Sequence, residues 1–62
     1  MDIHEIEKYM ESIKEYHYDS KLGDYNMTYM AEDAADHFDH DEWLDDETHI
    51  VWEAAFNVVS SK

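Results

Sequence analysis

The hydrophobic positions of the chain recur with the spacing of helices, and no segment alternates convincingly with the period of two that a strand shows. Between residues 2 and 18 the apolar side chains share one stripe of a helical wheel: Ile3, Ile6, Met10 and Ile13. His17 extends this stripe, so we expect it to be a hydrogen-bonded histidine at the core. Residues 19–23 then break the pattern, and Gly23 suits a helix end or a turn. A first helix is therefore predicted over residues 2–18.

A second helix is predicted over residues 25–38, with Asp24 or Asn26 as its N-cap. Its core-facing positions are Met27, Met30, Ala31, Ala34 and Phe38. The opposite side carries carboxylates together with Tyr25 and Tyr29. Core packing does not explain two tyrosines among carboxylates, so we expect both rings to contact a partner.

A third helix is predicted over residues 46–60, with Asp45 or Asp46 at its N-terminus, where negative charge suits the helix dipole. One face of this helix is apolar: Ile50, Val51, Ala54, Ala55 and Val58. Three further side chains widen the apolar face beyond what two other helices cover easily: Trp52, Phe56 and Val59. Because large exposed apolar patches mark interaction sites, these three residues are predicted to line a homodimer or partner interface.

Together these elements predict an all-α fold, a compact three-helix domain with a short acidic turn between the second and third helices. The turn, residues 39–46, is expected to be a helical turn or a loop that Trp43 and Leu44 attach to the core. With 62 residues, the chain is predicted to form one helical domain over residues 1–62. A chain of this length buries only about 60% of the surface that its unfolded form exposes, so its core is small.

Composition narrows the classes of function. The chain has no cysteine, which excludes disulfides and cysteine-based zinc sites. It begins without the basic and apolar regions of a signal peptide, and no apolar stretch is long enough to span a membrane, so we expect a cytoplasmic protein. The net charge of −13 argues against direct binding to nucleic acid or to an anionic membrane.

Two general explanations of the acidity, intrinsic disorder and adaptation to high salt, compete with a functional one. Intrinsic disorder is opposed by the hydrophobic content of 44%, the single glycine and the absence of proline. The acidic surface of a halophilic protein explains the charge itself. It does not explain why three of the four lysines lie within the first third of the chain.

The most informative feature is an acidic segment, residues 32–47, in which nine of sixteen side chains are carboxylates. They are Glu32, Asp33, Asp36, Asp39, Asp41, Glu42, Asp45, Asp46 and Glu47. No lysine or arginine occurs between Lys21 and Lys62. A field of one sign attracts a partner of the other sign, so the acidic segment is predicted to bind a positively charged protein.

The spacing of the carboxylates predicts what the acidic segment imitates. Glu32, Asp36 and Asp39 step about one helical turn at a time, roughly 5–6 Å apart, which can imitate a row of phosphates. Aromatic side chains often dominate the affinity of an interface. Tyr25, Tyr29 and Trp43 are therefore predicted to be its aromatic anchors.

Enzymatic function is not expected, and no cofactor is predicted. The serines stand in no nucleophile motif, and acid–base catalysis by paired carboxylates needs a pocket that separates their pKa values. His37 and His40, among aspartates, define a weaker alternative, a metal-binding module for zinc or a similar ion. Asp39, Asp41 and Asp45 are spaced like the ligands of an EF-hand loop, but the glycine at the sixth position and the glutamate at the twelfth are missing.

In its size, acidity and lack of cysteine the chain resembles small phage-encoded inhibitors that mimic DNA, of the anti-CRISPR and anti-restriction type. This resemblance rests on composition and charge pattern, and residues 32–47 carry it best. It implies a non-enzymatic viral protein in the host cytoplasm that blocks the nucleic-acid-binding site of a defence complex. Its partner would be a basic nucleic-acid-binding protein. The alternative is an antitoxin or immunity-type module that neutralises one basic protein.

Overall fold

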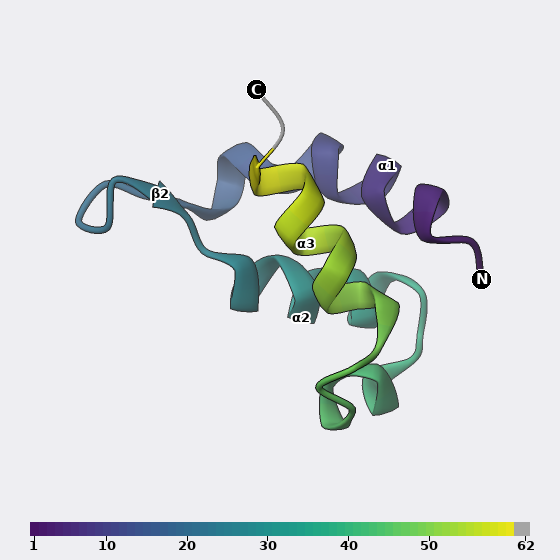
Figure 1. The fold of residues 1–62 in the computed structure, drawn as a ribbon. Helices are drawn as coiled ribbons and strands as arrows, with labels where there is room; N and C mark the ends of the chain where they lie inside the picture. The colour runs from purple at the N-terminus through teal and green to yellow at the C-terminus, as the bar shows by residue number, and fades with distance from the viewer. Residues whose placement is uncertain (61–62) are drawn as a thin grey trace.

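Three α-helices form the body of the protein in the computed structural model, which describes residues 1–60. They are α1 (Ile3–Ile13), α2 (Met27–His37) and α3 (Ile50–Ser60). Helix α3 crosses the other two and packs against both (Figure 1). The predicted three-helix fold, with a short turn between the second and third helices, is confirmed.

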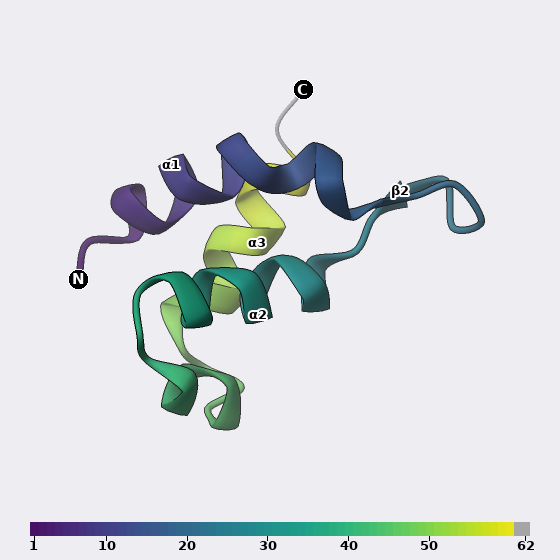
Figure 2. The ribbon, with the colours of Figure 1, turned by 180° about the vertical axis from the view of Figure 1, so that it is seen from behind.

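The core lies where the three helices meet, and Figure 2 shows the same arrangement from behind. Its fully buried helical side chains are Ile6 and Met10 of α1, Met30, Ala31, Ala34 and Ala35 of α2, and Val51, Ala54, Ala55 and Val58 of α3. The many alanines on α2 and α3 present little side-chain bulk, so the helices approach closely. The apolar stripes read from the sequence therefore form this core, with Ala35 as an addition. Five of the predicted core residues are only partly buried against it: Ile3, Ile13, Met27, Phe38 and Ile50.

A short 3₁₀ helix, η2 (Asp41–Asp45), closes one side of the core through Trp43, which is only 7% exposed. The indole stacks against the rings of His40 (5.0 Å between centroids) and His49 (4.7 Å). Phe38 approaches it at 5.9 Å. Residues from both sides of the turn thus hold one aromatic side chain, as predicted for the anchoring of this segment.

The first helix is shorter than predicted, and a hairpin follows it. After Ile13 the chain tightens into a second 3₁₀ helix, η1 (Lys14–His17), and then forms the antiparallel strands β1 (Tyr18–Asp19) and β2 (Asp24–Tyr25). The prediction of one helix to residue 18 was wrong in two respects: residues 14–17 form a 3₁₀ helix, and Tyr18 lies in a strand. Two-residue strands are too short to show a period of two, so the sequence pattern did not reveal the hairpin. In Figure 1 the hairpin projects from one end of the body.

Local polar groups explain the turn of the hairpin. The carboxylate of Asp19 accepts hydrogen bonds from the backbone N–H groups of Lys21 (2.8 Å) and Leu22 (3.3 Å). Gly23 has a φ of 72° and donates its N–H to the carbonyl of Asp19 at 2.8 Å. Glycine adopts this left-handed conformation without the steric cost of a side chain, so Asp19 and Gly23 together close the turn.

The third helix begins at Ile50, four residues later than predicted. Asp46 caps the turn that precedes it, because its Oδ1 accepts from the N–H (2.9 Å) and the hydroxyl (2.7 Å) of Thr48. At the start of the helix the Nδ1 of His49 accepts from the N–H of Val51 at 3.0 Å. At the second helix, by contrast, one of the two predicted N-caps, Asn26 rather than Asp24, is confirmed, with its side chain accepting from the N–H of Tyr29.

Helix α2 ends in a Schellman motif, which reverses the chain just where the acidic segment continues. The N–H of Asp39 donates to the carbonyl of Asp36 at 3.1 Å, and the N–H of His40 donates to the carbonyl of Ala35 at 2.9 Å. Asp39 occupies the left-handed position with a φ of 60°. The predicted helical row of Glu32, Asp36 and Asp39 is therefore wrong at Asp39, which lies beyond the end of the helix.

Replacing Asp39 by glycine should stabilise the protein. Left-handed backbone costs a residue with a side chain about 1 kcal/mol, and glycine is the residue that usually fills this position. We expect Asp39→Gly to raise the free energy of unfolding by about 1 kcal/mol. This corresponds to a rise of about 4–8 °C in melting temperature for a domain of this size.

Two further variants separate the backbone effect from the loss of a negative charge. Asp39→Asn removes the charge but keeps a residue that tolerates the left-handed conformation, whereas Asp39→Ala removes the charge and tolerates it poorly. Thermal unfolding should rank the variants Gly above Asn above Ala. Equal melting temperatures for glycine and alanine would show that charge alone decides stability at this position.

Candidate partner-binding surface

The carboxylates of the acidic segment line the outer side of α2 and the connection from α2 to α3. Eight of the nine predicted binding carboxylates are exposed, and only Asp33 is half-buried. Glu32 and Asp36 lie on α2, whereas the group from Asp39 to Glu47 follows the chain around η2. The structure thus provides an exposed acidic surface that extends from α2 over the neighbouring turn.

Few positive charges balance this surface. Within residues 1–60, the only ion pairs that involve the acidic segment use histidine, namely His17 with Asp33 (2.9 Å) and His40 with Glu42 (3.1 Å). Lys14 is paired with Glu11 of α1 at 3.3 Å. The field of the segment is therefore not neutralised by the described lysines.

Asp33 differs from its neighbours because both of its carboxylate oxygens are bound within the protein. Oδ1 accepts from the hydroxyl of Tyr9 on α1 at 2.6 Å, and Oδ2 lies 2.9 Å from Nε2 of His17 on η1. The predicted hydrogen bond of His17 is confirmed, but its ring is half-buried and does not belong to the core. Asp33 is half-buried and its carboxylate connects α2 to the first helical segment, so it is less accessible to a partner than the other predicted binding carboxylates.

The same contacts shift two pKa values in opposite directions. Partial burial by itself raises the pKa of Asp33, but the hydrogen bonds from Tyr9 and His17 stabilise the carboxylate and leave its pKa below the usual value. The hydrogen bond to Asp33, with burial and the charge of that carboxylate, raises the pKa of Tyr9 to about 12. Tyr9 therefore stays protonated and keeps donating across the physiological range.

The three predicted aromatic anchors have different environments. Tyr29 is 56% exposed. Tyr25 is half-buried, donates its hydroxyl to Glu15 at 3.1 Å and lies beneath the ammonium of Lys14 at 5.6 Å. Trp43 belongs to the core, so placing it on a partner surface was wrong, and only Tyr29 presents most of its ring to solvent.

The predicted apolar flank of α3 is only partly open. Phe56 is 59% exposed, whereas Trp52 and Val59 are half-buried. The indole N–H of Trp52 donates to the carbonyl of Asp46 at 3.0 Å, which holds the ring against the turn before α3. Phe56 is therefore the main apolar side chain that this flank offers to another molecule.

The two histidines of the metal alternative are engaged in separate aromatic stacks. His37 lies parallel to the ring of Tyr9, with 3.9 Å between centroids, and His40 stacks on Trp43. Within residues 1–60, no group of three or more histidine and carboxylate side chains is arranged to hold a metal ion. The geometry therefore gives no support to a metal centre at these histidines.

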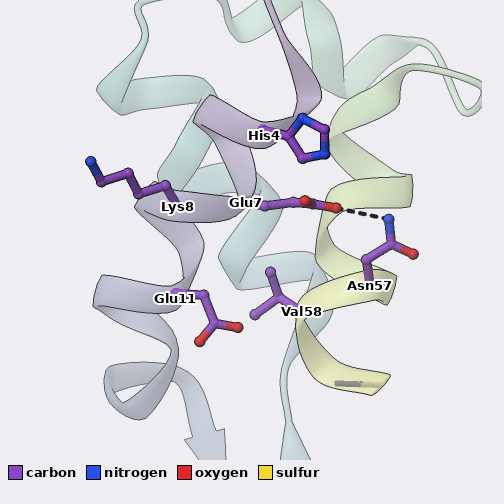
Figure 3. A pocket seen from close by; sticks show the side chains of 6 residues that line it. All are labelled: His4, Glu7, Lys8, Glu11, Asn57 and Val58. Atoms are coloured by element: carbon purple, nitrogen blue, oxygen red, sulfur yellow. Dashed lines mark hydrogen bonds between the residues drawn. The ribbon is translucent and has the colours of Figure 1, made fainter. Parts of the chain in front are cut away.

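A hollow of about 520 Å³ lies between α1 and α3 (Figure 3). A hydrogen bond of 2.8 Å from the amide of Asn57 to the carboxylate of Glu7 connects its two walls. His4, Lys8 and Glu11 also line it and are exposed, so water reaches all of these groups. We therefore interpret this hollow as the seam between two helices, which a polar contact bridges.

Comparisons with protein-family models, curated proteins and solved structures found no match for this chain. Among the described residues, none of the helices combines the length and the apolar character needed to cross a membrane.

Replacing Asp33 by asparagine should destabilise the fold in a pH-dependent way. A hydrogen bond to a charged group contributes about 1.5–3 kcal/mol, so we expect Asp33→Asn to lower the free energy of unfolding by about this amount near pH 7. Because the folded pKa of Asp33 is lowered, its contribution is present above the unfolded value of about 3.9 and is lost as pH falls through the folded pKa. The difference from wild type should therefore shrink in acid.

Asp36→Asn is the matched control, since it removes an exposed carboxylate from the same helix. Chemical denaturation at a series of pH values should show little or no destabilisation for this variant. Equal losses for Asp33→Asn and Asp36→Asn would contradict a structural role for the Asp33 contacts.

Stability should also rise with salt. The seventeen carboxylates repel one another in the folded state because only four lysines offset them, and salt screens this repulsion over about 10 Å at 0.1 M. Thermal unfolding between about 20 mM and about 0.5 M sodium chloride should show an increasing melting temperature. An unchanged melting temperature would indicate that the acidic surface carries no concentrated field.

Proposed function

We propose that the protein is a non-enzymatic inhibitor whose acidic surface occupies the nucleic-acid-binding site of a basic partner, as a mimic of DNA. The observation that carries this proposal is the exposed group of eight carboxylates on α2 and around η2, with no lysine pairing among the described residues. Such a surface attracts the lysine and arginine side chains with which proteins bind phosphates.

The density of charge supports mimicry of a duplex. The net charge of −13 over a longest extent of 29 Å corresponds to about one charge per 2.2 Å. Duplex DNA carries about one charge per 1.7 Å of its axis. A groove that accepts DNA would therefore meet a comparable number of negative charges on this protein.

A second candidate function is supported by the irregular arrangement of the carboxylates. Asp39 lies beyond the helical row, and Asp33 is bound to Tyr9 and His17, so Glu32 and Asp36 alone keep the spacing of one turn on α2. Irregular spacing suits a surface that fits one dedicated basic protein, as an antitoxin or immunity-type module does. Competition with nucleic acid separates the two functions.

Competition binding tests the proposal directly. Labelled duplex DNA would be bound to each of a panel of purified restriction and CRISPR effector complexes, and this protein would then be added. We expect displacement of the DNA from at least one complex. The association rate should fall about tenfold or more as salt rises, because the field steers encounter. A target that binds both molecules at once, with neither weakening the other, would contradict mimicry and favour the dedicated partner.

A triple variant tests the acidic surface by replacing three of its exposed carboxylates by lysine: Glu32→Lys, Asp36→Lys and Asp45→Lys. None of these three side chains makes a hydrogen bond among the described residues. We expect this triple variant to lose binding by about 100-fold or more, because it introduces repulsion at the interface. The control variant reverses the charge of three exposed carboxylates outside the acidic segment: Glu5→Lys, Glu11→Lys and Glu53→Lys. Both variants change the net charge equally, so equal losses would show that only total charge matters.

A further inference from the structure

A second exposed surface lies at the hairpin end of the molecule. Among residues 1–60, four of the six large hydrophobic side chains that are exposed come from this region: Tyr16, Tyr18, Leu22 and Tyr29. They belong to η1, β1, the hairpin turn and α2. Exposed apolar side chains scattered singly need no explanation, but a group at one end of a protein marks an interaction site.

Three of these rings surround a hollow of about 390 Å³. Tyr16 is 84% exposed, Tyr18 is 50% exposed and Tyr29 is 56% exposed, so the rings offer their surface to an incoming group. Asp19 and Lys21 also line the hollow, and one carboxylate oxygen of Asp19, Oδ1, already accepts the backbone N–H groups of the turn. Rings and a carboxylate around a small cavity are the components with which proteins hold organic cations.

The backbone fixes the walls of the hollow before any ligand arrives. The hairpin pairs Tyr18 with Tyr25, and the N–H of Asn26 donates to the carbonyl of His17 at 2.7 Å, which joins η1 to the start of α2. The ring of His17 lies 6.3 Å from that of Tyr29 and is itself held by Asp33. A preformed site loses less conformational entropy when it binds.

The protein already contains one contact between a cation and an aromatic ring beside the hollow. The ammonium of Lys14 lies 5.6 Å from the centroid of Tyr25, which is a cation–π contact. The ring of Tyr25 in turn meets that of Tyr18 edge-on at 5.3 Å. The outer side of Tyr18 and the rings of Tyr16 and Tyr29 can therefore accept a cation from another molecule in the same manner.

We propose that this hollow binds an arginine side chain of the basic partner. The net charge of −13 attracts cations to the protein as a whole and disfavours binding of a second copy of the chain or of an anion. Within the hollow Asp19 and Lys21 offset each other, so the aromatic rings supply the preference for a cation. A planar guanidinium stacks on aromatic rings and is less strongly hydrated than an ammonium, so arginine fits exposed tyrosines better than lysine does. The inference rests on the proposed function only for the basic character of the partner.

Binding of a defined probe tests the inference without the partner. The probe is a blocked Gly-Arg-Gly tripeptide, and its control carries citrulline, which has the same shape without the charge. In an NMR titration at constant ionic strength, the arginine peptide should shift the ring resonances of Tyr16, Tyr18 and Tyr29 in a saturable manner. The citrulline peptide should bind several-fold more weakly.

Variants make the test specific to the hollow. Tyr16→Ala should weaken binding of the arginine peptide about two- to fivefold, the effect expected for one exposed cation–π contact. Lys21→Ala should strengthen binding, because it removes the positive charge from the wall. Phe56→Ala, a change to an exposed ring on α3, should leave the affinity unchanged. Circular dichroism of each variant checks that the fold is intact.

Two results would overturn the inference. One is equal binding of the arginine and citrulline peptides. The other is a set of shifts confined to residues 39–47, which would show that the peptide only condenses on the acidic surface. Failure here leaves the competition assay with DNA unaffected, since that assay depends on the carboxylates of the acidic segment. Failure of the competition assay would in turn leave arginine binding to the hollow measurable.

Discussion

The small hydrophobic core must keep the chain folded against the repulsion among its surface carboxylates, and the rest of the structure depends on this constraint. Among residues 1–60 the buried side chains are all hydrophobic, and none is charged. All seventeen carboxylates therefore lie at the surface or at its edge, where water reduces their repulsion. Helix α3 makes this possible, because its alanines and valines pack against both α1 and α2.

The acidic residues consequently divide into two kinds with different physical roles. Asp19, Asp33 and Asp46 accept hydrogen bonds from nearby groups and help to shape the chain. Others, such as Glu32 and Asp36, face solvent and add to the field around α2. Asp46 belongs to both kinds, because it is exposed on the acidic surface and also caps the turn before α3. The number of carboxylates alone therefore does not tell how many of them serve only to bind a partner.

The two proposed surfaces contribute to binding in complementary ways. The acidic surface acts over distance and loses strength as salt screens it, whereas contacts with aromatic rings act only at short range and depend less on salt. The hairpin projects from the body, and the acidic turn around η2 lies away from it (Figures 1 and 2). A partner that touched both surfaces would need to extend along the protein. Charge would then bring the partner close, and the rings would fix its position.

The sequence by itself determined the helices and their buried faces, because a periodic pattern of apolar side chains is a local property of the chain. It identified Ile6 and Met10, Met30 and Ala34, and Val51 and Val58 as core residues, and Asn26 as an N-cap. It also indicated the acidic segment and the hydrogen-bonded character of His17.

Only the tertiary structure decided which polar side chains are free. Asp33 meets Tyr9 across 24 positions of sequence, a separation that no periodic pattern reveals. The left-handed backbone of Asp39 was not expected, since glycine usually marks such a position. Trp43 is buried by rings from both sides of its turn, and the tyrosines of the hollow come from segments that the hairpin brings together. Contacts between distant residues depend on how the helices pack, and that packing is set by the whole chain at once.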